Sequence, residues 1–110
     1  MAQVTPVQII AEGRVAVAGG VPSFTWVRGA NSIADTGAGI VTITLDDPAD
    51  ATSPGTATFA TPTTSANGFF VTSIRPNDTT VAFYVWSATG VAADNVGFDF
   101  LVLQAPTTNT

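Results

Sequence analysis

The chain has 110 residues, of which 45% are hydrophobic and only 10% are charged, and its formal net charge is −5. This length suits a single domain, and disordered chains show the opposite balance of charge and hydrophobicity. The three cations, Arg14, Arg28 and Arg75, form no basic cluster in the sequence, which argues against binding to nucleic acid or to an anionic membrane surface.

The N-terminal third predicts two short strands. Val15 and Val17 alternate with less apolar residues ahead of a flexible Gly19-Gly20 turn. In the next run we expect Phe24, Trp26 and Arg28 to share one face, because side chains in a strand alternate between its two faces. A loop is expected to follow.

The middle of the chain continues this pattern. Val41–Leu45 alternates apolar residues with threonine, which is typical of a half-buried strand. The strand is expected to stop at Asp46-Asp47-Pro48, because proline has no N–H to continue a ladder. A weaker strand is predicted over Thr56–Ala60, between two prolines.

The C-terminal half carries the strongest strand signals. Asn67-Gly68 favours a type I′ turn and leads into an apolar run ending at Ile74. The turn Arg75–Asp78 is expected to return the chain antiparallel along Thr80–Trp86. After a loop, the last strand is predicted over Gly97–Leu103.

These signals predict an all-β domain, an antiparallel β-sandwich or jelly-roll-like barrel of about seven to eight short strands. We expect an N-terminal arm at residues 1–12, the β-domain at 13–104 and a C-terminal tail at 105–110. The N-terminus has no secretory signal pattern, so synthesis in a cytoplasm is expected.

The last two predicted strands are apolar on both faces. Two explanations remain open: this chain's own loops cover the second face, or a symmetry mate does. The low content of charge favours a homo-oligomer, because interfaces are poor in charged residues. The interface candidates are Trp26, Tyr84, Trp86, Leu101 and Leu103.

The chain lacks several residue types that commonly carry out catalysis, because it contains no His, Cys or Lys. Histidine-dependent triads, thiol nucleophiles, Schiff bases and His- or Cys-ligated zinc sites are therefore excluded. Asp35-Thr36-Gly37 matches the loop motif of aspartic proteases. Its surroundings lack the apolar strand before the motif, the flap and the C-terminal helix of such enzymes, so a simple turn is favoured.

Two weaker patterns also have a simpler structural explanation. Asp46-Asp47-x-x-Asp50 offers oxygen ligands for calcium, but its spacing and Pro48 favour a solvated acidic turn. The aromatic residues Trp26, Tyr84 and Trp86 are able to stack on sugars, although such residues more often anchor cores or interfaces. The sequence therefore predicts no catalytic residue, no cofactor and no metal site.

Five segments of the chain follow a pattern seen in a known type of domain. They are Gly13-Arg14-Val15, Phe24-x-Trp26, Ile33-x-x-x-Gly37-x-Gly39-Ile40-Val41-Thr42-Ile43, Asn67-Gly68-Phe69-Phe70-Val71 and residues 88–100. Together they resemble, over residues 13–103, a domain common in structural proteins of tailed bacteriophages. In such domains a strand and a turn lead into a glycine-rich strand, and the second half of this chain is similar to the ending of phage head- and tail-fibre domains.

The resemblance implies a trimeric, jelly-roll-like module without enzymatic activity. It favours a capsid decoration or cement protein on the virion surface, with itself and the major capsid protein or another virion protein as partners. The alternative is a receptor-binding tail fibre or tail adaptor module that binds a host glycan or protein through the expected loops Arg28–Gly39 or Thr89–Gly97.

Overall fold

The computed structural model describes residues 8–47, 56–64 and 68–104. Within these residues the chain forms β-strands and no helix, so the predicted antiparallel β-sandwich is confirmed. The strands are β1 (Gln8–Ala18), β2 (Val21–Arg28), β3 (Ala30–Gly37), β4 (Ile40–Leu45), β5 (Thr56–Pro62), β6 (Phe70–Ile74), β7 (Thr80–Trp86) and β8 (Phe98–Gln104).

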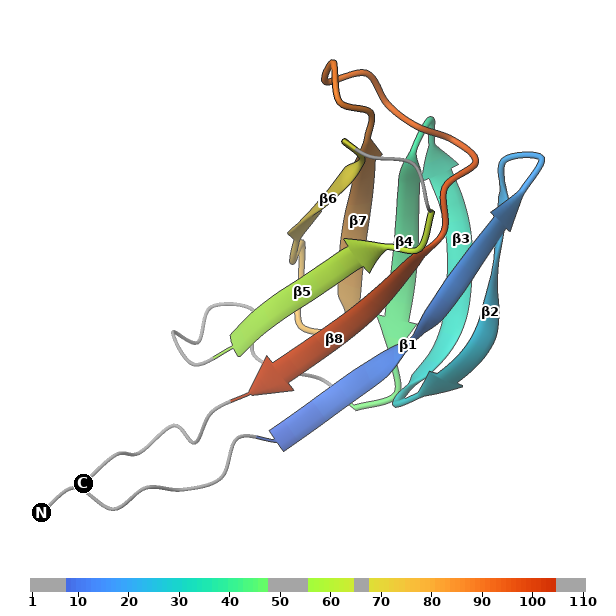
Figure 1. Cartoon of the computed structure of the whole chain (residues 1–110). Helices are drawn as coiled ribbons and strands as arrows, with labels where there is room; N and C mark the ends of the chain where they lie inside the picture. The colour runs from blue at the N-terminus through green and yellow to red at the C-terminus, as the bar shows by residue number, and fades with distance from the viewer. Residues whose placement is uncertain (1–7, 48–55, 65–67, 105–110) are drawn as a thin grey trace, which may run out of the picture.

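The strands form two antiparallel sheets of four strands each, stacked face to face (Figure 1). Sheet A has the order β2-β1-β8-β5, and sheet B has the order β3-β4-β7-β6. The first strand pairs with the last in sheet A, and β4 pairs with β7 in sheet B. Both of these pairs join strands that are far apart in the chain.

The core lies between the sheets and is built from alternate residues of the inner strands. Val41, Ile43 and Leu45 are buried, as the alternation in this segment predicts. The Phe83 ring of sheet B lies 5.0 Å from the ring of Phe98 and 5.6 Å from that of Phe100, both in sheet A. These aromatic contacts join the two sheets at the centre of the sandwich.

Two of the predicted turns are confirmed. Gly19 and Gly20 connect β1 to β2 with φ values of 59° and 77°, a left-handed conformation that glycine adopts without strain. In the turn between β6 and β7, the side-chain oxygen of Asn77 accepts hydrogen bonds from the backbone N–H groups of Thr79 (2.9 Å) and Thr80 (3.0 Å). Asparagine stabilises turns in this way.

The connection between β5 and β6 differs from a tight hairpin. Asn67 lies outside the described residues, while Gly68 has a φ of 92°. β5 belongs to sheet A and β6 to sheet B, so the chain crosses between the sheets here. The favoured turn pair therefore introduces β6 without pairing it to the strand before it.

The expected loop after β2 is wrong, because residues 30–37 form the edge strand β3. This segment has low strand propensity, since alanine, asparagine, aspartate and glycine are depleted in strands. An edge strand needs few inward side chains, and Ala30 and Ile33 supply them. Pairing with β4 provides the rest of its stability.

The prediction that Phe24, Trp26 and Arg28 share a face is also wrong. Val15 lies opposite Phe24 while its neighbour Arg14 lies opposite Trp26, which leaves Thr25 as an extra residue. Such a β-bulge reverses the alternation. Phe24 packs against the core, whereas Trp26 and Arg28 are on the outer face.

The two ends of the described chain pair with each other. Gln8 lies opposite Gln104, and the pairing continues through Glu12 opposite Leu101. Residues 8–12, which the sequence assigns to an arm, are thus part of sheet A. Residues 1–7 and the tail at 105–110 lie outside the described residues.

Candidate functional site on two outer faces

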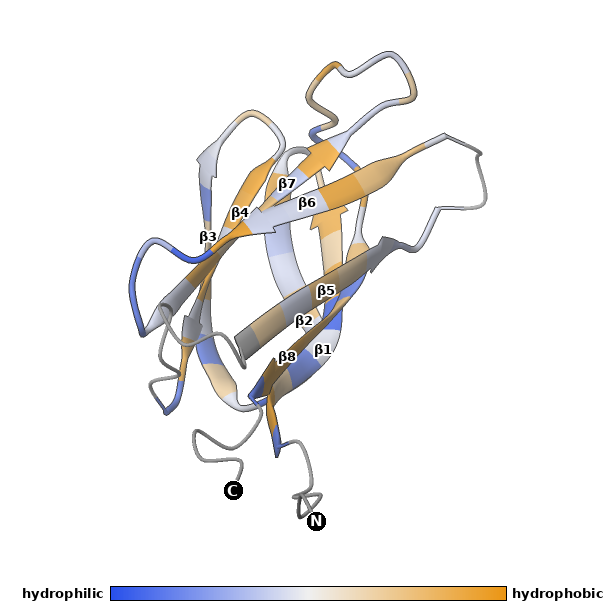
Figure 2. Ribbon diagram, turned by 90° about the vertical axis from the view of Figure 1, so that its left-hand side faces the viewer, coloured by the Kyte–Doolittle hydropathy of each residue, from blue (hydrophilic) through white to orange (hydrophobic). Residues whose placement is uncertain are grey.

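The predicted interface residues divide into two groups on opposite sides of the sandwich. Tyr84 and Trp86 alternate with buried residues of β7, so they lie on the outer face of sheet B. Trp26, Leu101 and Leu103 lie on the outer face of sheet A. The explanation by the chain's own loops is not supported in the described residues, where neither outer face has a third layer above it (Figure 1, Figure 2).

The outer face of sheet B carries no charged side chain, and we call it the neutral face. Its outward positions follow from the pairing of β3, β4, β7 and β6. Threonine and serine hydroxyls alternate there with aliphatic and aromatic groups. The residues are Ser32, Ala34, Thr36, Ile40, Thr42, Thr44, Phe70, Thr72, Ile74, Thr80, Ala82, Tyr84 and Trp86.

An aromatic cluster lies at one end of the neutral face. The ring of Trp86 is nearly parallel to the rings of Tyr84 (6.2 Å between centroids, 11°) and Phe70 (6.4 Å, 23°). The indole Nε1 of Trp86 donates a hydrogen bond to the hydroxyl of Thr72 at 2.9 Å. This hydrogen bond satisfies the polar group of Trp86 and fixes the ring at the surface.

The outer face of sheet A combines charged and apolar side chains, and we call it the mixed face. Its charged half contains two ion pairs, Arg14–Asp99 and Arg28–Glu12. Its apolar half lies toward the start of β1 and the end of β8. That apolar half consists of Ile9, Ala57, Phe59, Leu101 and Leu103.

The Arg14–Asp99 pair is bidentate and joins β1 to β8. Arg14 Nε donates to Asp99 Oδ1 at 2.7 Å, and Nη2 donates to Oδ2 at 3.1 Å. This hydrogen bonding lowers the pKa of Asp99 and raises the pKa of Arg14 from their ordinary values. Both side chains are about half exposed, so water and salt screen the pair.

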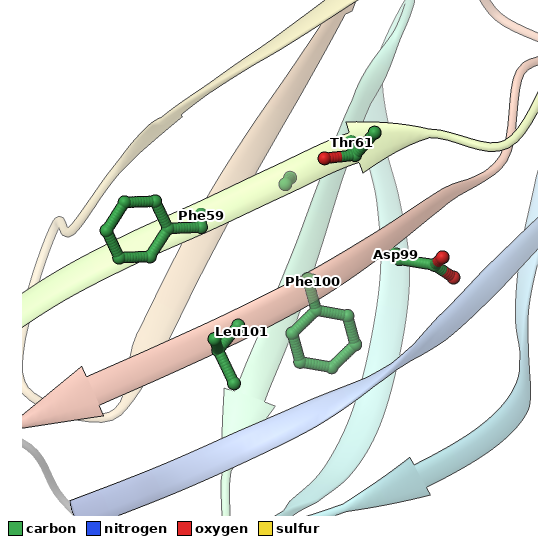
Figure 3. Close-up of a pocket in the computed structure, with 6 residues that line it drawn as sticks. Phe59, Thr61, Asp99, Phe100 and Leu101 are labelled. Carbon is green, nitrogen blue, oxygen red and sulfur yellow. The ribbon is translucent and has the colours of Figure 1, made fainter. Parts of the chain in front are cut away.

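A shallow hollow of about 210 Å³ lies between β5 and β8 on the mixed face (Figure 3). Phe59 and Leu101 form one side, and Thr61 and Asp99 form the other. Small-molecule sites usually occupy ~300–1,000 Å³ and bury most of their ligand. Among the described residues that line the hollow, Asp99 is the only one with a carboxylate, and it is already paired with Arg14.

The Asp35-Thr36-Gly37 motif lies at the end of the edge strand β3. Asp35 is exposed and accepts a hydrogen bond from the backbone N–H of Gly37 at 3.2 Å. The hydroxyls of Thr36 and Thr42 are 2.9 Å apart. The turn expected there follows the motif instead, because Ala38 and Gly39 connect β3 to β4.

No group of acidic side chains that could hold a metal ion is present in the described residues. Asp46 and Asp47 of the calcium-like pattern are exposed, and Asp50 lies outside the described residues. The described part of the chain also contains no helix long and apolar enough to span a membrane.

The connection between β7 and β8 ties the turns of both sheets together, which the sequence did not predict. Asp94 Oδ1 accepts a hydrogen bond from the N–H of Gly39 (3.1 Å) in sheet B's hairpin. Asn95 Oδ1 accepts one from the N–H of Gly20 (2.8 Å) in sheet A's hairpin. The adjacent polar pair Asp94-Asn95 was the signal available, since such residues hydrogen-bond to backbone groups in turns.

The described residues present two broad outer surfaces, the neutral face and the mixed face. No protein-family model matches the chain, and no curated protein or solved structure is significantly similar to it.

Proposed function

We propose that this chain is a non-enzymatic structural protein of a virus particle. In this proposal it is a decoration or cement protein that binds the head surface as a trimer, with the major capsid protein or another virion protein as its partner. The resemblance to phage structural domains motivates the proposal, and its physical support comes from the surface.

The observation that carries the proposal is the exposure of large apolar side chains on both outer faces. Ile9, Phe59 and Trp26 are exposed on the mixed face, and Phe70 and Ile74 are exposed on the neutral face. Monomeric soluble proteins rarely expose large contiguous apolar patches, and such patches mark sites of association. A small domain that uses both faces in contacts suits a cement role, because many weak copies on a symmetric shell act together.

The receptor-binding alternative has support of its own in the aromatic cluster. Stacked rings beside hydroxyl groups are suited to sugars as well as to proteins. The connection at 87–97 lies next to this cluster, since Ala92 forms a β-bridge with Trp86. The two functions differ in partner, which makes them separable by binding experiments.

The test is co-sedimentation of the purified chain with undecorated capsids of the virus that encodes it, after its mass in solution is measured. The same capsids already carrying the protein are the matched control, because their sites are occupied. A trimer that sediments only with undecorated capsids supports the cement proposal. A trimer that ignores capsids and binds host cells supports the alternative, and binding to neither contradicts both.

A further inference from the structure

Among the described residues, no charged side chain lies on the neutral face. Glu12 and Asp99 lie on the mixed face, and Asp35 lies on the free edge of β3. The remaining described carboxylates are in the connections between strands. With a net charge of −5, two copies of this chain repel each other wherever their carboxylates meet. The neutral face brings no carboxylate of one copy against another, whereas the mixed face carries two carboxylates, each paired with an arginine.

The symmetry of an assembly decides how many patches each copy uses. A two-fold dimer uses one self-complementary patch on each copy, whereas a ring such as a trimer uses two different patches on each subunit.

The two outer faces lie on opposite sides of the sandwich, and this limits which surface can serve as the second patch of a ring. If the neutral face of one copy packed on the mixed face of the next, the contacts would repeat along a straight row and leave it open. A closed ring therefore uses only one of the two outer faces. The mixed face displays both signs of charge, from Arg14 and Arg28 and from Glu12 and Asp99, which suits a partner with a complementary charge pattern.

We propose that the neutral face is the surface through which copies of this chain associate, and that the mixed face remains free for a different protein. This inference rests on the self-association in the proposed function. Beyond that function, it assigns the surface through which the copies associate and the kind of partner that each face binds.

The chain offers matched pairs of residues for the test. Phe70 on the neutral face and Phe59 on the mixed face are 44% and 56% exposed, and both lie on edge strands. Ile74 on the neutral face and Ile9 on the mixed face are 53% and 58% exposed. The double variants Phe70→Arg/Ile74→Arg and Phe59→Arg/Ile9→Arg thus introduce the same charge at sites of similar exposure.

The experiment measures the mass of each variant in solution by light scattering and its dissociation constant by sedimentation. The neutral-face variant is expected to raise the dissociation constant by about 100-fold or more, because each introduced arginine would bury an unpaired charge in the contact. The mixed-face variant is expected to keep the wild-type mass. Circular dichroism checks folding, and the single variants Ile74→Arg and Ile9→Arg replace a double variant that does not fold.

The outcomes separate this inference from the proposed function. If the mixed-face variant dissociates the oligomer, or if the neutral-face variant leaves it intact, the assignment of faces is overturned while the oligomer stands. A wild-type chain that is a monomer overturns the self-association and the inference together. Binding to undecorated capsids is measured separately and tests the partner.

Discussion

The two outer faces of the sandwich belong to sheets with the same number of strands, yet they carry different kinds of side chain. The mixed face carries ion pairs in one half and apolar side chains in the other, whereas the neutral face has hydroxyl, aliphatic and aromatic groups and no charge. A chain with three cations and eight carboxylates has few charges to distribute. Two ion pairs lie on the mixed face and no charged side chain lies on the neutral face, and this difference motivates the proposal of a different partner for each face.

The largest expected effect concerns the core on which both faces depend. Phe83→Ala should destabilise the fold by about 3–5 kcal/mol, because it leaves a cavity against Phe98 and Phe100. Phe59→Ala, at an exposed site of the mixed face, should change stability by less than about 1 kcal/mol. Urea unfolding of both variants measures the difference. Equal losses would mean that Phe59 is buried in the native protein.

The hydrogen bonds of Asp94 and Asn95 give the next largest effect. Replacing both residues by alanine should cost about 2 kcal/mol, since each hydrogen bond contributes about 1 kcal/mol. Asp94→Ala alone should speed amide exchange at Gly39 in sheet B, and Asn95→Ala alone should speed it at Gly20 in sheet A. Val91→Ala, in the same connection and exposed, is the control. Uniform exchange changes in every variant would contradict the assigned contacts.

Substitutions of the two tryptophans compare the stability that each outer face gains from its indole ring. Trp86→Phe removes the hydrogen bond to Thr72 and should cost about 1 kcal/mol. Trp26→Phe should cost less than about 0.5 kcal/mol, because the Trp26 indole has no hydrogen-bond partner in the described residues and is half exposed. Thermal unfolding of the two variants measures both effects. A larger loss for Trp26 would reverse the comparison.

The smallest effect is the pH dependence of the mixed face. Because hydrogen bonding from Arg14 lowers the pKa of Asp99 in the folded state, the pair stabilises the fold above the ordinary carboxyl pKa of ~3.9. That stability is lost as the pH falls through the lowered pKa. In Arg14→Gln, an NMR titration should return the pKa of Asp99 toward its ordinary value. An unchanged pKa would show that the ion pair does not form in solution.

Local patterns predicted the parts of the fold that depend on local alternation. Val41–Leu45 shows the period of two in its residues, and the structure buries its apolar members. The missed strand β3 lacks such a pattern, because it lies at an edge and contributes few inward side chains. The sequence did not predict the bulge at Thr25, because the bulge depends on the pairing of β2 with β1.

The sequence also could not predict which interface candidates lie on the neutral face and which lie on the mixed face. Trp26, Leu101 and Tyr84 are all apolar residues in strands, and their faces depend on which sheet each strand joins. Strand β8 pairs with β1 and β5, while β7 pairs with β4 and β6. Most of these pairings join segments far apart in the chain, and hydrophobic alternation contains no information about them.

The most direct test uses the unmodified protein and compares both faces in one sample. Hydroxyl-radical footprinting measures the oxidation rates of Phe70 and Trp86 on the neutral face and of Phe59 and Trp26 on the mixed face. In the free oligomer, we expect slowed oxidation of Phe70 and Trp86 relative to the dilute monomer, with Phe59 and Trp26 unchanged until capsids are added. Slowed oxidation of Phe59 and Trp26 in the free oligomer, with Phe70 and Trp86 unchanged, would contradict the assignment of the faces.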